Sequence, residues 1–405
     1  TITRMEPHRV LELAGRGPQF GAVDRLRLEQ RSGGTRLSYG VEIRFSQAPN
    51  PLAGRIGRLW FDRYAEKTLR RLGRMLSGSA RPPALSPMTR MADQAILPGL
   101  MGFTRLGHAL ARGRRPVASA LYRGRTVVLT GGTSGIGKAA ARDLYRKGAH
   151  LVVVGRDAQK LDALGGALTA LRGGGSLETA VADLSLLAEV RRLSARLVRR
   201  HRNIDVLINN AGALFNRYTL TVEGFESTLA TDLLSPYLLT RLLLPALRSA
   251  GAARIINVAS GGMYTQAMRA DYLNPSAALH DGPTAYARAK RGLVILTRHW
   301  AKELAPAGIS VHAMHPGWVD TPGLRRSLPA FHRQLSAWLR TPAQGADTIV
   351  WLASSPDAPR ASGRFWLDRK IRATHVFRHT RTAPEADLRL IGALNHLCGL
   401  SPSER

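Results

Sequence analysis

Short apolar runs alternate with longer stretches of helical periodicity between Arg125 and about Leu367. The runs TVVLT, HLVVV, DVLIN, RIINVAS and ISVHAMH are expected to be strands, and the stretches between them to be helices. Strands joined through helices run parallel, because the helix carries the chain back across the sheet. The alternation therefore predicts an α/β fold, a doubly wound parallel sheet with helices on both faces.

The first of these strands ends in the loop TGGTSGIG, and a helical stretch begins directly after it. Gly131 permits a tight turn, while Gly135 and Gly137 let the backbone approach a pyrophosphate at the helix N-terminus. In a strand–loop–helix setting, such glycines predict a dinucleotide site rather than a plain glycine turn. The residues expected to bind the cofactor here are Gly131, Thr133, Ser134, Gly135, Ile136, Gly137 and Lys138.

The end of the second strand bears on which dinucleotide is bound. Val154 is followed by Gly155, Arg156 and Asp157. A site selective for NAD usually has an acidic residue at this strand end, whereas Arg156 and Lys138 can hold a 2′-phosphate by charge-assisted hydrogen bonds. We therefore expect NADP in preference to NAD. The alternative is that Arg156 is a solvated cation and Asp157 contacts the ribose.

Further motifs follow in order along the chain: Asp183-Leu184, Asn209-Asn210-Ala211-Gly212, a strand-end Ser260, Tyr286 and Lys290 within TAYARAK, and Pro316-Gly317. With these motifs, residues 120–370 resemble the short-chain dehydrogenase/reductase family, whose fold is of Rossmann type. The stretches SGGM, HPGWVDTPG, AQGADT and SGRFWLDRK, with the helix before the first strand, are most like the branch represented by dehydrogenase/reductase SDR family member 12.

The resemblance implies catalytic roles for Ser260, Tyr286 and Lys290. Tyr286 and Lys290 lie one helical turn apart, so both can reach one ligand. An ammonium about 4 Å from a phenol contributes roughly 4 kcal/mol at an effective dielectric of about 20, which would lower the phenol pKa by about three units. Tyr286 could then protonate a carbonyl oxygen that Ser260 holds. The alternative is that these are structural polar residues.

The resemblance also extends the cofactor site beyond the glycine loop. It implies that Lys290 binds the nicotinamide ribose and that Asp183 reaches the adenine. The whole set implied here is Asp183, Leu184, Asn210, Ala211, Gly212, Tyr286, Lys290, Pro316, Gly317 and Thr321.

Asp232 departs from the family pattern. It stands in FESTLATDLLSPYLLT, where the family has a catalytic asparagine whose amide holds a water of a proton relay. A carboxylate can accept the same hydrogen bond, but its charge competes for Lys290 and weakens the effect on Tyr286. We therefore expect Asp232 to slow turnover without abolishing it.

The chain before residue 120 has a different pattern. Residues 36–45 alternate as a strand does, the turn RSGGT joins them to an earlier strand, and residues 51–78 have helical spacing. This resembles the C-terminal half of a START-like, polyketide-cyclase-like domain with a helix-grip fold, although a closed cavity is not expected. The predicted division is a partial START-like α+β segment at 1–78, a linker and lead-in helix at 79–119, the Rossmann domain at 120–375 and a tail helix at 376–405.

The formal charge is +31, and 52 of the 59 basic residues are arginines spread along the whole chain. This spread favours the nucleotide composition of the genome as the reason for the many arginines. Attraction to an anionic membrane surface stays open as an alternative. Nucleic-acid binding is not expected, because no aromatic–basic interleaving accompanies the charge. The longest apolar runs are too short to cross a membrane, which favours a cytoplasmic location. The single cysteine and scattered histidines predict no metal site.

These features together predict an NADP-dependent oxidoreductase acting on a carbonyl or alcohol. A lipophilic substrate is expected, because apolar residues follow two of the site motifs: Met263, Tyr264, Trp318, Leu324, Leu328, Phe331 and Trp338. The same side chains could be ordinary packing. A cofactor-binding scaffold without turnover and a lipid carrier working through the N-terminal segment stay open, and the family resemblance implies a homo-oligomer.

Overall fold

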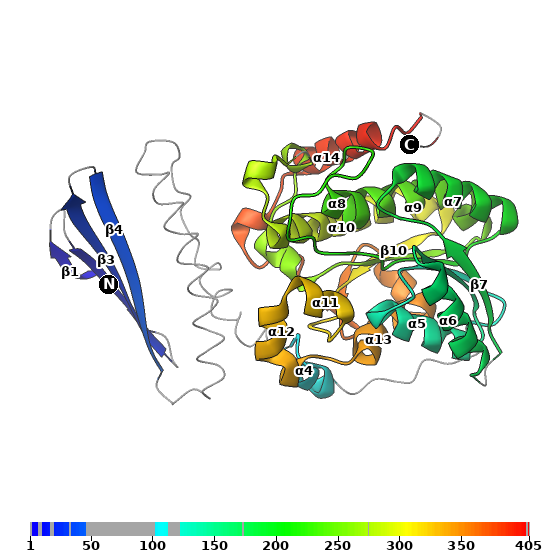
Figure 1. The fold of residues 1–405 in the computed structure, drawn as a ribbon, viewed down its shortest axis with the longest axis horizontal. Coiled ribbons are helices and arrows are strands. Elements are labelled where there is room, and N and C mark those ends of the chain that lie inside the picture. Colours follow the sequence, from blue (N-terminus) through cyan, green and yellow to red (C-terminus); the bar gives the residue numbers. More distant parts are fainter. Residues whose placement is uncertain are drawn as a thin grey trace. The chain divides into compact units, whose positions relative to one another are not determined.

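The computed structural model divides the chain into two compact units, Thr1–Leu85 and Ser86–Arg405 (Figure 1). The structure describes strands at 2–6, 10–16, 20–31 and 34–45, and residues 102–111, 122–171, 174–273, 275–401 and 404.

The first unit contains a four-stranded antiparallel sheet in the order β1-β2-β3-β4. The strands are β1 (Ile2–Glu6), β2 (Val10–Arg16), β3 (Phe20–Arg31) and β4 (Gly34–Phe45). The predicted hairpin is present, with Arg31 opposite Gly34 and Leu28 opposite Leu37. The predicted helix at 51–78 lies outside the described residues, so the START-like resemblance stays a prediction.

The second unit is built on an eight-stranded sheet in the order β12-β11-β10-β9-β8-β5-β6-β7. All neighbours pair in parallel except β11 and β12, which are antiparallel. The strands are β5 (Thr126–Thr130), β6 (His150–Gly155), β7 (Ser176–Val181), β8 (Val206–Asn209), β9 (Arg254–Val258), β10 (Ser310–Met314), β11 (Phe365–Leu367) and β12 (Lys370–Arg372). The predicted doubly wound parallel sheet is confirmed, and β12 is an addition that the sequence did not indicate.

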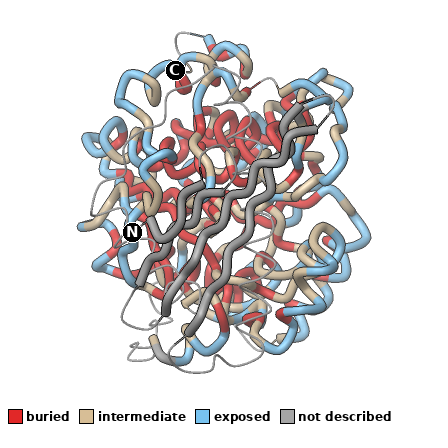
Figure 2. The backbone as a smooth tube through the Cα atoms, turned by 90° about the vertical axis from the view of Figure 1, so that its left-hand side faces the viewer, coloured by how far each residue is buried: buried red, intermediate tan, exposed pale blue. Residues whose placement is uncertain are grey.

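Helices cover both faces of this sheet and enclose one apolar core on each. Core residues of α5 (Gly135–Arg146), α6 (Ala158–Thr169) and α13 (Pro342–Ser354) cluster on one face. The other core takes residues from α7 (Leu187–Arg200), α9 (Ser235–Ser249), α10 (Gly282–Glu303) and the tail helix α14 (Pro384–Leu397). Figure 2 shows the buried residues gathered inside this unit. This layering brings the carboxyl ends of the parallel strands, and the loops after them, to one edge of the sheet.

Of the predicted lead-in helix at 94–113, only residues 102–111 are described, and within them α4 (Arg105–Leu110) is helical. It begins after Thr104, whose hydroxyl caps the helix by accepting from the Gly107 N–H at 3.3 Å. Among the described residues, no helix has both the length and the apolar character needed to cross a bilayer.

Candidate functional site

Hydrogen bonds between strand ends hold the glycine loop in place. The Thr130 hydroxyl, at the end of β5, accepts from the backbone N–H groups of Asn210 and Ala211, each at 3.0 Å. The Asn210 amide in turn donates to the carbonyl oxygens of Thr130 at 2.9 Å and Gly131 at 3.1 Å. The predicted Asn-Asn-Ala-Gly stretch is therefore joined directly to the predicted phosphate loop.

The glycines of the loop stand where a side chain would not fit. Gly131 has φ +69°, and a Cβ on Gly137 would come within 2.1 Å of the Gly131 carbonyl oxygen. The loop leads into α5, whose N-cap residue, Ser134, makes no side-chain capping bond. The first N–H groups of α5 are thus not capped by that side chain and are suited to a pyrophosphate, which an NAD(P) cofactor would supply.

The charged residues after β6 have different surroundings. The Asp157 carboxylate caps α6, accepting from the Lys160 N–H at 3.1 Å and pairing with the Lys160 ammonium at 2.7 Å. Arg156 is exposed and has no ion-pair partner among the described residues, and Lys138 is exposed in the first turns of α5. The carboxylate is therefore engaged locally, while two cations remain available beside the loop.

Asp183, after β7, is likewise engaged with its neighbours. Its carboxylate accepts from the Ser185 N–H at 2.9 Å and the Ser185 hydroxyl at 2.8 Å, while its own N–H donates to Glu189. Leu184 beside it is 8% exposed. These contacts order the loop at the predicted adenine end.

Four predicted catalytic side chains come together beside the glycine loop. Tyr286 and Lys290 lie on α10, and the Lys290 ammonium is 5.5 Å from the centre of the Tyr286 ring. Ser260 follows β9 and accepts from the Gly262 N–H at 3.2 Å. The fourth side chain, Asp232, has a carboxylate oxygen 3.5 Å from the Lys290 nitrogen.

Asp232 lies in a π-helical turn, Ala230–Leu234, directly before α9. Such turns are rare and often occur at functional sites, because they re-aim one side chain. The carboxylate is completely buried and accepts from the Ala213 N–H at 2.8 Å. Burial raises the pKa of Asp232 to about 6, although Lys290 acts in the opposite direction.

The surroundings of Tyr286 differ from the prediction made from Lys290 alone. Burial is the main influence and raises the pKa of Tyr286. Lys290 and a hydrogen bond from Ser260 lower the pKa, whereas Asp232 raises it further. The prediction counted the ammonium but not the loss of solvent, which disfavours a phenolate.

The loop after β10 lies close to the glycine loop. Gly317 has φ +81°, and its N–H donates to the His315 ring at 3.1 Å. Thr321 caps the short helix α11 (Pro322–Ser327), and a Cβ on Gly135 would come within 3.0 Å of the Thr321 methyl group. Pro316, Gly317 and Thr321 thus belong to a loop that meets the predicted cofactor loop.

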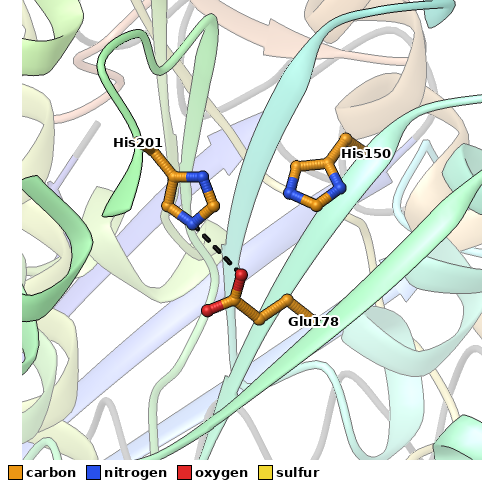
Figure 3. A group of neighbouring side chains, drawn as sticks. All are labelled: His150, Glu178 and His201. Carbon is orange, nitrogen blue, oxygen red and sulfur yellow. Dashed lines mark ion pairs between the residues drawn. The ribbon is translucent and has the colours of Figure 1, made fainter. Parts of the chain in front are cut away.

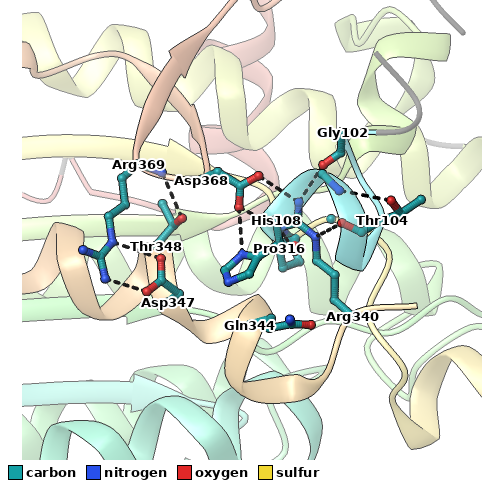
Figure 4. Close-up of polar contacts among 12 residues, drawn as sticks. Gly102, Thr104, His108, Pro316, Arg340, Gln344, Asp347, Thr348, Asp368 and Arg369 are labelled. Atoms are coloured by element: carbon teal, nitrogen blue, oxygen red, sulfur yellow. Dashed lines mark hydrogen bonds and ion pairs between the residues drawn. The ribbon is translucent and has the colours of Figure 1, made fainter. Parts of the chain in front are cut away.

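A buried ion pair that the sequence did not predict connects the lead-in segment to this loop (Figure 4). Arg340 makes two 2.8 Å contacts with the Asp368 carboxylate and also donates to the carbonyl oxygens of Gly102, Thr104 and Pro316. Asp368 lies in the turn between β11 and β12 with φ 55°. Nothing in the sequence signals that these distant residues meet.

The same contacts bring Phe103 close to Ser260. Its ring lies 3.1 Å from where a Cβ on Gly261, next to Ser260, would stand, and its centre is 5.7 Å from that of Trp318. Trp318 contacts Phe331 in turn, at 5.3 Å between ring centres. Met263, by contrast, is completely buried in the core. Part of the predicted apolar mouth is therefore core packing, and Phe103 is an aromatic neighbour that the sequence did not indicate.

One group of possible metal ligands lies among the described residues, although none was predicted. His150, Glu178 and His201 bring ligand atoms within 4.8 Å of one another (Figure 3). The Glu178 carboxylate is 3.3 Å from the His201 Nε2 and 3.0 Å from the Arg200 guanidinium. Because a guanidinium this close opposes a bound cation, we assign the group to an ion-pair network.

The chain is similar in sequence to known proteins. The family model for short chain dehydrogenases matches residues 125–330. Dehydrogenase/reductase SDR family member 12 of Bos taurus is 40% identical over 276 residues, which cover 68% of this chain and 86% of that protein. Retinol dehydrogenase 14 of Mus musculus is 35% identical over 268 residues, or 62% of this chain and 79% of that protein.

A solved structure agrees in fold. The Pseudomonas aeruginosa RhlG/NADP active-site complex has a TM-score of 0.50 and 28% identity, covering 62% of this chain and 96% of that one. The motifs, the sheet order and the matched length lead to one assignment. The chain belongs to the short-chain dehydrogenase/reductase family and is an NAD(P)-dependent oxidoreductase that acts on CH–OH groups.

Proposed function

We propose that this chain is an NADP-dependent enzyme that interconverts a lipophilic carbonyl compound and its alcohol, with Tyr286 as the acid/base. The observation that carries the proposal is the convergence of Ser260, Tyr286 and Lys290 beside a glycine loop that is suited to a pyrophosphate. NADP, when bound, supplies or accepts the hydride.

The chain's own residues would manage the proton and the substrate oxygen. In the reducing direction, Ser260 donates a hydrogen bond to the carbonyl oxygen, and the Tyr286 hydroxyl transfers its proton to that oxygen as the alcohol forms. Lys290 stabilises the phenolate that remains, and its second role is to bind the nicotinamide ribose. Asp232 accepts from Ala213 and faces Lys290, so its charge opposes this stabilisation.

A lipophilic substrate is supported by the aromatic side chains around the site and by the relatives. Phe103, Trp318 and Phe331 form a continuous aromatic row beside Gly261. One relative carries the name retinol dehydrogenase 14, which indicates an apolar alcohol for that protein. The first test is NADPH oxidation with a panel of aldehydes and ketones of increasing apolar length. The proposal predicts that kcat/KM rises with length, and a preference for short, charged carbonyl compounds would contradict it.

NADP preference is expected to depend on Arg156. Replacing Arg156 by Ala removes a cation that can bond the 2′-phosphate, and a charge-assisted hydrogen bond contributes about 1.5–3 kcal/mol. The Kd for NADPH should therefore rise about 10- to 100-fold while the Kd for NADH stays nearly constant, as measured by cofactor fluorescence titration. Arg142→Ala, an exposed arginine on α5, is the matched control. Equal weakening of NADPH and NADH would instead favour ribose contact by Asp157.

A second function, a cofactor-binding scaffold, is favoured by one observation. The ion pair between Asp232 and Lys290 neutralises the cation on which Tyr286 depends. Tight NADPH binding with no turnover on the whole panel would support the scaffold. The remaining alternative, a lipid carrier working through the N-terminal segment, depends in part on residues 51–78, which lie outside the described part of the chain.

A further inference from the structure

A cavity of about 650 Å³ lies apart from the cofactor and substrate residues. It is bounded by the second half of α10, by residues 362–365 at the start of β11, and by residues 371–375 from β12 onward. Arg298, which lines it, is twelve residues beyond Tyr286 on α10, a rise of about 18 Å along the helix. None of its lining residues belongs to the predicted dinucleotide site.

All the charged side chains in the lining are basic. Five of its residues are cationic, and no aspartate or glutamate lines it; the five are Arg298, Lys302, Arg364, Arg372 and Arg381. Arg298 pairs with Asp387 at 3.3 Å. Among the described residues, the other four have no ion-pair partner. All five are exposed to solvent, so an anion bound in the hollow could be reached by several cations at once.

Hydrogen bonds hold the backbone of one cavity wall in place. The Tyr264 hydroxyl donates to the Ala373 carbonyl oxygen at 2.7 Å, and Arg291, which is 1% exposed, donates to the Thr374 carbonyl oxygen at 2.6 Å. Phe365, 1% exposed, contributes an apolar surface to the lining. These contacts fix the backbone of residues 373–374, so one wall of the hollow is ordered before a ligand binds.

The pKa of His375 reflects the same positively charged surroundings. Burial lowers the pKa of His375 to about 4, and Arg291, Arg298 and Arg381 act in the same direction. At neutral pH the imidazole is therefore uncharged, and the charge around the hollow comes from the arginines and Lys302.

We propose that this cavity is a second anion site, which binds a compound carrying a phosphate or polyphosphate group. Guanidinium groups match phosphate oxygens with two parallel hydrogen bonds, and the volume lies within the range of small-molecule sites. The phosphate can belong to a soluble compound or to a lipid headgroup, and the two sources share this chemistry.

The test uses the full chain saturated with NADP, so that the dinucleotide site is filled. Inorganic pyrophosphate and ATP are titrated by calorimetry into the wild type and into the double variant Arg372→Ala/Arg381→Ala. Sedimentation with phosphatidylcholine vesicles, with and without phosphatidic acid, forms the lipid arm. The matched control is Arg196→Ala/Arg199→Ala, which removes the same charge from exposed positions on α7.

The cavity variant is expected to bind at least one of these probes about tenfold or more weakly, whereas the control should change binding by less than about threefold. Weaker binding of pyrophosphate or ATP by the cavity variant would identify a soluble ligand. Weaker binding only to vesicles that contain phosphatidic acid would identify a lipid headgroup. Equal weakening in both double variants would attribute binding to the overall charge and overturn the proposal. Absence of binding in all arms would overturn it as well.

Discussion

Replacing Tyr286 by Phe is expected to lower kcat about a thousandfold while the Kd for NADPH stays within about twofold. The substitution removes only the hydroxyl, and a positioned acid/base typically contributes about 10²- to 10⁴-fold to the rate. The ring would remain in place beside Lys290, whose ammonium is 5.5 Å from its centre. Steady-state kinetics with the best aldehyde of the panel, together with a fluorescence titration of NADPH, measures both quantities.

Tyr272→Phe is the matched control for this variant. Tyr272 lies outside the site, and its ring contact with Arg288 would survive the substitution. Its kcat should remain near that of the wild type. A Tyr286→Phe enzyme with nearly full activity would show that another group delivers the proton, and the assignment of Tyr286 would then be wrong.

Replacing Asp232 by Asn is expected to raise both kcat and stability at neutral pH. In the wild type the charge of Asp232 raises the pKa of Tyr286, whereas Lys290 lowers it. The amide that replaces the carboxylate would be uncharged, so only the effect of the Lys290 ammonium would remain. One unit in the pKa of the acid corresponds to up to about a tenfold change in rate. A kcat that is unchanged or lower in the variant would contradict this account of the proton relay.

The gain in stability should depend on pH in a defined direction. Burial raises the pKa of Asp232 from an ordinary value near 4 to about 6, so the folded state binds a proton more tightly than the unfolded state. Well below pH 4 the carboxyl group is protonated in both states, and its burial then has no charge-related cost. Above about pH 6 it is ionised in both states, and the folded protein carries the whole cost, about 3 kcal/mol.

Denaturant unfolding at pH 4 and at pH 7.5 measures this effect. The difference in unfolding free energy between Asp232→Asn and the wild type should be about 3 kcal/mol at pH 7.5 and fall below about 1 kcal/mol at pH 4. Asp271→Asn, at a carboxylate that is 69% exposed, should leave stability unchanged at both pH values. A difference that does not vary with pH would mean that burial of the charge is not the cause.

Most residues of the predicted site are close in space because they follow a parallel strand or lie in the first half of a helix. The glycine loop follows β5, Asn210 follows β8, Ser260 follows β9 and Pro316 follows β10. Since the carboxyl ends of parallel strands share one edge of a sheet, their order along the chain was enough to predict that they meet. Tyr286 and Lys290 could be paired from helical spacing alone.

What the sequence by itself determined is therefore whatever depends on local periodicity and on strand order: the doubly wound sheet, the glycine loop after its first strand, and the pairing of Tyr286 with Lys290. Tertiary structure alone decided how charges are buried and paired. The completely buried Asp232, the Arg340–Asp368 pair that fastens residues 102–104, and the basic cavity beyond α10 all bring together side chains from distant parts of the chain. The physical reason is that a charge's energy depends on its neighbours in space and on the solvent it loses, neither of which sequence spacing records.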